Sequence, residues 1–142
     1  MINQDQIARP PNVMELVGTD PCIGLDEQHV LKNFLGKNQT EAIEICKNLA
    51  VTENFSYMAE AGLTYYLPAA ASYLLSPDAK EDWEFSHGLM CSLSCQIQSG
   101  SLNGSAIPLI KEIAEYCNRN RDKFEIGDDD LFDDYLAAIR NA

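Results

Sequence analysis

The most concentrated polar groups in this 142-residue chain are carboxylates near its C-terminal end. Six acids fall within ten residues, with no Lys or Arg among them: Glu125, Asp128, Asp129, Asp130, Asp133 and Asp134. Asp in the first turn of a helix interacts favourably with the helix dipole, which accounts for two or three of the six. Like charges four residues apart on a helix are mildly unfavourable. The excess therefore predicts either a surface for a basic protein partner or a solvated face that serves solubility.

A second acidic patch surrounds the single tryptophan of the chain. Glu81, Asp82 and Glu84 flank Trp83. Tryptophan is enriched in the hot spots of protein–protein interfaces, and acids around it suit a basic partner. Capping of a helix start explains the same acids nearly as well. Glu81, Trp83 and Glu84 are therefore the second candidates for partner contact.

His87, Cys91 and Cys95 recur every four residues, so on a helix they share one face. Imidazole and thiolate groups at this spacing can hold zinc when a fourth ligand comes from elsewhere. The chain has no C-x-x-C pair, and Leu89 and Leu93 indicate that this helix is largely buried. Core packing is the favoured interpretation, and we expect no metal and no cofactor.

An enzyme would have to use one of two groups of side chains. The first is His87 with Cys91, but a Cys–His nucleophile pair needs contact and a third, orienting group. No protease or transferase signature surrounds the cysteines. The second is Tyr65 and Tyr66 beside a pocket opened by Pro68. We expect no enzymatic activity.

Two kinds of binding loop are excluded. An EF-hand frame starting at Asp122 places Gly127 at loop position six, but it puts Phe124 and Ile126 where calcium needs oxygen ligands. The glycines near residue 100 lack the lysine and the strand–loop–helix context of a phosphate-binding loop.

The overall charge limits the class of partner. Against 22 Asp and Glu stand 10 Lys and Arg, a formal net charge of −12. Nucleic-acid backbones and anionic membranes both bind clustered cations, so neither is expected as a partner. A strong negative charge favours solubility and fast association with something basic. The 46% share of apolar residues is typical of a globular domain.

Cysteine usage and the N-terminal residues indicate a reduced, cytoplasmic protein. The five cysteines cannot all pair within one chain. Asp5 and Arg9 lie near the N-terminus without an apolar run, so no secretory signal is expected. The longest uncharged apolar stretch, residues 61–77, is too short and too polar to span a bilayer.

The elements that position these groups are expected to be helices. Residues 1–24 contain three prolines and two glycines and predict an irregular arm that lies along the body. From residue 25 onward apolar residues recur with helical spacing, and no stretch alternates with period two over the length of a strand. We expect a single all-α domain over residues 25–142, with six or seven helices.

Capping residues mark the first helices. Asp26 can cap a first helix, which Gly36 ends as a left-handed residue. Asn38 and Glu41 have the spacing of a capping box for a second helix. A helical stripe then runs from Phe55 onward, and Pro68 is expected to break or kink that helix.

Later helix limits follow from similar signals. Ser76 and Pro77 predict the start of a long helix that Gly100 ends. Ser105 can start the next helix, and Asp128 or Asp129 can cap the last one. The apolar side of this last helix is expected to be Leu131, Phe132, Tyr135, Leu136 and Ile139. The shared helical periodicity predicts one core containing Phe55, Met58, Leu63, Tyr66, Leu74, Leu89, Leu93, Ile110, Ile113 and Leu136.

An ordered series of motifs lies within residues 30–76. It consists of F-L-G-K at 34–37, F-S-Y-M at 55–58, Y-Y-L-P-A at 65–69 and Y-L-L at 73–75. The series resembles a family of small, mostly uncharacterised bacterial proteins marked by F-x-G-K followed by Y-Y-L-P-A. Members of this family look like companions of toxins or solitary cytosolic proteins. The resemblance implies no catalytic residue for this chain, and the acidic C-terminal third lies outside it.

Small size, acidity and this resemblance together predict an immunity protein, or antitoxin. It would bind one cognate bacterial toxin with a basic surface and block it without catalysis. The alternative is an acidic adaptor or nucleic-acid mimic that occupies a basic groove of a regulatory partner. A mimic needs acids spaced like phosphates over an extended surface, whereas these acids bunch at two helix starts.

Overall fold

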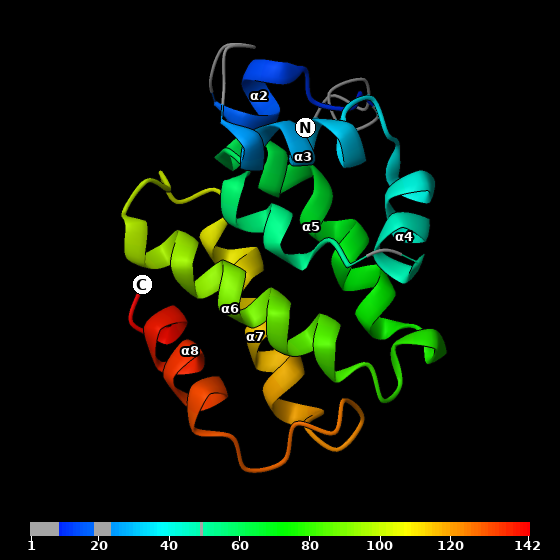
Figure 1. Ribbon diagram of the computed structural model, residues 1–142. Helices are drawn as coiled ribbons and strands as arrows, with labels where there is room; N and C mark the ends of the chain where they lie inside the picture. The colour runs from blue at the N-terminus through cyan, green and yellow to red at the C-terminus, as the bar shows by residue number, and fades with distance from the viewer. Residues whose placement is uncertain (1–8, 19–23, 49) are drawn as a thin grey trace, which may run out of the picture.

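The computed structural model describes residues 9–18, 24–48 and 50–142, and all regular structure in these ranges is helical (Figure 1). The all-α class predicted from the sequence is confirmed. The elements, in chain order, are α2 (Val13–Val17), α3 (Leu25–Phe34), α4 (Gln39–Asn48), the 3-10 helix η1 (Thr52–Tyr57), α5 (Glu60–Leu75), the 3-10 helix η2 (Pro77–Ala79), α6 (Trp83–Ser99), α7 (Ile107–Arg119) and α8 (Asp130–Arg140).

The two longest of these helices, α5 and α6, form the centre of the molecule. α4 packs along α5, while η1 and α8 pack on α6. α7 lies behind α6 in the view of Figure 1 and contacts α5, α6 and α8. α2 and α3 cover one end, and α8 lies at the opposite end (Figure 1). Within the described ranges, no helix has both the length and the apolar character needed to cross a membrane.

One hydrophobic core joins these helices, and all ten core residues predicted above are buried in it. The motifs of the resemblance meet there. The Phe34 ring lies 5.6 Å from that of Phe55 and 4.9 Å from that of Tyr66, between ring centroids. The buried Tyr66 hydroxyl lies 2.5 Å from the carbonyl oxygen of Phe34 and 2.8 Å from that of Lys37. It therefore ties the turn after α3 to the middle of α5.

The N-terminal arm is not irregular throughout. Residues 13–17 form α2, with a capping box in which Asn12 Oδ1 accepts from Glu15 N–H at 2.9 Å and Glu15 Oε1 accepts from Asn12 N–H at 3.0 Å. This capping box was not predicted from the sequence. The expectation for residues 1–8 and 19–23 lies outside the described residues.

Pro68 was expected to break or kink its helix, and the break does not occur, because α5 continues from Glu60 to Leu75. A proline removes one intrahelical donor, here the one that would reach the Thr64 carbonyl. The residues on both sides, Leu67 and Ala69, are fully buried, so core packing holds the helix together. Gln39 adds a side-chain hydrogen bond from Nε2 to the Tyr65 carbonyl, 2.5 Å.

The helix expected from Phe55 onward is split. η1 ends at Tyr57, Met58 is extended, and α5 begins only at Glu60. The carbonyls of Phe55 and Met58 accept hydrogen bonds from the buried amide of Gln96, both at 2.8 Å. A side chain forty residues away along the chain thus replaces intrahelical bonds at this point.

Three other helix starts also differ from expectation. α3 begins after Gly24, and Asp26 lies in its first turn. α6 begins at Trp83 and not at Pro77, because Pro77–Ala79 form η2 and Glu81 takes a left-handed φ of 67°. α7 begins at Ile107, after the Glu60 carboxylate has accepted the backbone N–H groups of residues 103, 104 and 106. The Asn38–Glu41 capping box and the Gly100 cap are confirmed.

The close contact between α2 and α5 generates a first prediction. A Cβ on Gly62 would lie 2.7 Å from the carbonyl oxygen of Leu16, so the backbone of α2 would have to move. Gly to Ala in a helix is usually stabilising by about 0.5–1 kcal/mol. Here we expect Gly62→Ala to lower the free energy of unfolding by about 1–3 kcal/mol, as overpacking does.

Urea unfolding at neutral pH measures this change. Thr64→Ala, on the exposed side of the same helix, is the control and should shift stability by no more than about 0.5 kcal/mol. A Gly62→Ala variant more stable than the wild type would show that α2 does not rest on Gly62.

Candidate protein-binding face

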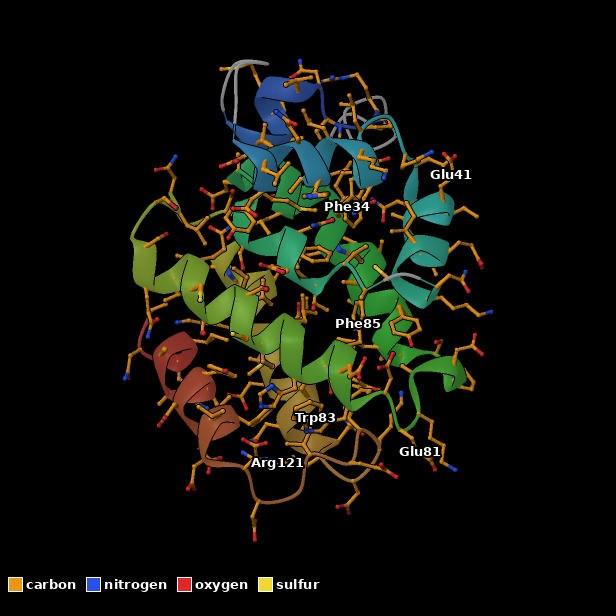
Figure 2. All side chains as sticks on the ribbon, viewed as in Figure 1. Phe34, Glu41, Glu81, Trp83, Phe85 and Arg121 are labelled. Atoms are coloured by element: carbon orange, nitrogen blue, oxygen red, sulfur yellow. The ribbon has the colours of Figure 1, made fainter. Side chains whose placement is uncertain are left out.

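The two acidic patches found in the sequence lie at the same end of the fold. α6 and α8 pack against each other, and both begin at the lower end of the view in Figure 1. Glu81 and Trp83 from the start of α6 are seen there together with Arg121 (Figure 2). The N–H of Glu81 donates to the carbonyl of Lys123 at 2.7 Å, which joins the two segments directly. We call this surface, formed by residues 81–84 and 125–134, the acidic face.

Asp129 links the start of α8 to α6. One carboxylate oxygen caps α8 by accepting the Phe132 N–H at 2.9 Å, and the other lies 3.4 Å from His87 Nε2 on α6. The hydrogen bond from Phe132 and the nearby imidazole hold the pKa of Asp129 below its usual range, although desolvation acts in the opposite direction. Asp129 was predicted to contact a partner, whereas its carboxylate contacts Phe132 and His87 within the fold.

His87 lies between Trp83 and Tyr135. Its ring stacks on Trp83, with centroids 4.4 Å apart, and meets Tyr135 edge-on at 5.4 Å. Its Nε2 is the one buried side-chain nitrogen or oxygen among the described residues that makes no hydrogen bond. Because Trp83 rests on this buried ring, its indole has a defined orientation although 41% of it is exposed.

Cys91 and Cys95 follow His87 at four-residue steps on α6, and Cys91 contacts α8. A hydrogen bond with the Cys91 thiol and burial raise the pKa of Tyr135 on α8 to about 12. Cys95 is exposed. Over the ranges 9–18, 24–48 and 50–142, no three His, Cys, Asp or Glu side chains are grouped so that they could hold a metal ion.

Arg121 lies beside the acidic face and was not among the residues predicted from the sequence. Its guanidinium donates to Asp133 Oδ1 at 2.6 Å and to the carbonyl of Gly127 at 3.0 Å, and it lies 4.5 Å from the centre of the Phe132 ring. It therefore neutralises Asp133 and holds the loop before α8. In the sequence Lys123 lies nearer to these acids than Arg121 does, so spacing alone does not identify the residue that pairs with Asp133.

Of the other acids of the face, Asp82 is used by the fold, since its carboxylate accepts hydrogen bonds from the Phe85 N–H and the Tyr73 hydroxyl. The rest are open to solvent, and their carboxylates form no hydrogen bond or ion pair in the part of the chain that the structure describes: Glu81, Glu84, Glu125, Asp128, Asp130 and Asp134. Like charges held close together repel one another, and here the fold does not compensate them. A cation from another molecule would do so.

Leu131 was expected on the buried side of α8, and this expectation is wrong. Its exposed fraction is 57%, whereas Phe132 and Leu136 are buried. Leu131 lies four residues before Tyr135, so both occupy one side of the helix. Trp83, His87 and Tyr135 follow one another through ring contacts, and Leu131 lies one turn before Tyr135, so the acidic face includes two exposed apolar side chains, Trp83 and Leu131.

A separate groove of about 910 Å³ includes Tyr65 and Pro68, the second group considered for an enzyme. Tyr66 points away from it into the core. Its charged residues are engaged, since Glu60 accepts the N–H groups before α7 and Arg9 forms a bidentate pair with Glu15 at 2.9 Å.

Comparison of the chain with protein families, curated proteins and solved structures found no match.

The contacts of Asp129 with α8 and α6 generate a second prediction. Replacing this N-cap by Ala should lower the free energy of unfolding at pH 7 by about 0.5–2 kcal/mol. Asp129→Asn keeps a capping oxygen and should lose less, because only the charge is removed.

The pH dependence separates these two contributions. The folded-state pKa of Asp129 lies below its usual 3.8, so its charge stabilises the fold above that pH. This contribution should disappear as the pH falls through the folded-state pKa, and the difference between wild type and Asp129→Asn should shrink with it. Urea unfolding from neutral to acid pH measures both effects. Equal stability of the wild type, Asp129→Ala and Asp129→Asn at pH 7 would contradict the role of Asp129 in linking α8 to α6.

Proposed function

We propose that this chain is a cytoplasmic immunity protein that binds a cognate bacterial toxin through the acidic face and inhibits it by covering a basic surface. The main supporting observation is that the starts of α6 and α8, which carry the two acidic patches and the exposed Trp83 and Leu131, are joined through His87, which stacks on Trp83 and contacts Asp129. The toxin as partner rests on the motif resemblance. Inhibition by covering requires no catalytic group on this chain.

Charge supports the choice of a basic partner. The chain carries a formal net charge of −12, and the carboxylates of six acids of the face lack internal partners in the described residues. Electrostatic attraction of this kind raises association rates by orders of magnitude over those of a neutral pair. Fast capture is what a cell needs from an inhibitor of its own toxin.

The apolar centre supports tight binding as well as fast binding. Protein interfaces combine a desolvated centre, often containing tryptophan, with a polar rim. Trp83 and Leu131 supply such a centre, and Glu84, Asp130 and Asp134 supply part of the rim. The stack on His87 orients Trp83 before binding, which reduces the entropy lost in the complex.

The arrangement is less suited to a nucleic-acid mimic. The acids gather at one end of the molecule, where two helices begin (Figure 1). A mimic of a phosphate backbone would present them at regular intervals along an extended surface. A dedicated protein partner therefore fits the face better than a general nucleic-acid-binding groove.

Neutralising the free acids tests the electrostatic part of the proposal. The probe is the protein encoded by the reading frame adjacent to the gene of this chain. The triple variant Asp128→Asn, Asp130→Asn, Asp134→Asn should associate with it at least about tenfold more slowly at low salt and protect cells less well. The control is Asp26→Asn, Glu44→Gln, Glu53→Gln, which removes three exposed charges outside the acidic face and should behave like the wild type.

Stopped-flow association at low salt and at about 0.15 M salt measures this effect, and growth of cells producing both proteins measures protection. Equal loss in the two triple variants would show that only net charge matters. If the neighbouring protein is not toxic, or if the wild-type chain does not relieve its toxicity, the immunity function is wrong for this pair.

Truncating the apolar centre tests the contact itself. Leu131→Ala should raise the dissociation rate from the same partner by about tenfold or more, the equivalent of at least ~1.4 kcal/mol. It should change the association rate little, because no charge is altered. Leu25→Ala removes an equally exposed leucine on α3 and should leave both rates unchanged. An unchanged dissociation rate for Leu131→Ala would place the interface away from α8.

A further inference from the structure

A second surface of the molecule, between α5 and α7, has the features of a contact between two copies of this chain. An apolar hollow of about 240 Å³ lies there, lined by Leu75, Leu109, Ile113 and Tyr116 and by two charged residues, Glu112 and Arg119. Leu75 at the end of α5 is 64% exposed beside it. A leucine this exposed next to an apolar hollow leaves a surface that another protein surface can cover.

The charged and apolar residues of α7 form one stripe. Glu112 and Ile113 lie three and four residues after Leu109, and Tyr116 and Arg119 continue from Ile113 at three-residue steps, so all five lie on one side of the helix. Glu112 and Arg119 are seven residues apart, roughly 10 Å along the helix axis. They are too far apart to pair with each other.

Neither charge finds a partner of its own within the fold. Glu112 and Arg119 are exposed, and neither side chain makes a hydrogen bond or an ion pair with another described residue. On the same side of α7, Glu115 lies four residues before Arg119, and its pKa is lowered first by the hydrogen bond to Arg140 and last by the charge of Arg119. The carboxylate of Glu115 is already held by Arg140 through two hydrogen bonds, 2.6 and 2.9 Å.

A surface with an acid at one end of an apolar stripe and a base at the other is self-complementary in an antiparallel pair. If a two-fold axis passes perpendicular to α7 near Tyr116, the α7 helices of the two copies are antiparallel. It then brings Glu112 of each copy to Arg119 of the other, so that one rotation forms both ion pairs. A different protein would need a matching base and acid at the same spacing, whereas a second copy supplies them by symmetry.

We propose that the α5–α7 face is a homodimer interface, in which Glu112 of each copy pairs with Arg119 of the other across the apolar hollow and the exposed Leu75. This face and the acidic face use different residues. The dimer is therefore independent of the proposed function and presents two acidic faces.

The net charge predicts an unusual salt dependence. Two copies at −12 each repel one another at long range, and added salt screens this repulsion within about 10 Å at 0.1 M. The contact pairs lie within a few ångströms and are screened less. Dimerisation should therefore strengthen from low salt to about 0.15 M, opposite to the capture of a basic partner.

Charge reversal gives the sharpest test, with sedimentation velocity at micromolar concentrations and about 0.15 M salt as the measurement. Glu112→Arg alone and Arg119→Glu alone each place like charges opposite each other twice and should weaken dimerisation at least tenfold. An equimolar mixture of the two variants should form a heterodimer, because each Arg then faces a Glu. The chain with both changes should dimerise like the wild type.

Leu75→Asp tests the apolar part and should give a monomer, while Leu25→Asp on α3 is the matched control and should still dimerise. Circular dichroism checks that every variant keeps its helices. A wild-type chain that stays monomeric at all these concentrations overturns the proposal. So does a dimer that survives both single reversals, or a mixture that remains monomeric.

Discussion

The contact between Asp129 and His87 determines where the C-terminal helix lies, and the character of the acidic face depends on it. Asp129 starts α8 through the Phe132 N–H and reaches His87 Nε2 at 3.4 Å with its other oxygen. His87 in turn carries Trp83 on its ring. One carboxylate therefore sets the start of a helix, its position against α6 and the orientation of the most prominent aromatic residue on the surface.

Arg121 completes this arrangement from the opposite side. Its guanidinium binds the Asp133 carboxylate and the Gly127 carbonyl, and so fixes the loop before α8 against the C-terminal end of α7 although the loop is rich in acids. The acids thus divide into two groups with different tasks. Asp129 and Asp133 are used by the fold, while Asp128, Asp130 and Asp134 remain available for another molecule. An acidic sequence segment is for this reason a poor measure of how much charge a surface offers.

Elsewhere, side chains from distant parts of the chain decide where helices begin and end. Gln96 takes two carbonyls before α5, and Glu60 takes three N–H groups before α7. In each case a buried or half-buried backbone group has a partner outside its own helix, so the helix need not extend to satisfy it. The same principle lets α5 continue through Pro68, where core packing outweighs one lost hydrogen bond.

Local chemistry made the helical class, the core positions and several caps predictable. Apolar periodicity reports which side of a helix is buried, and the Asn38–Glu41 box, the Gly100 cap and the Asp129 cap involve only neighbouring residues. The sequence also identified the acids and Trp83. It did not reveal that α2 packs on Gly62, that α6 begins at Trp83, that Leu131 is exposed or that Arg121 pairs with Asp133. Each of these depends on contacts between residues far apart in the chain, and only the packing of whole helices brings such residues together.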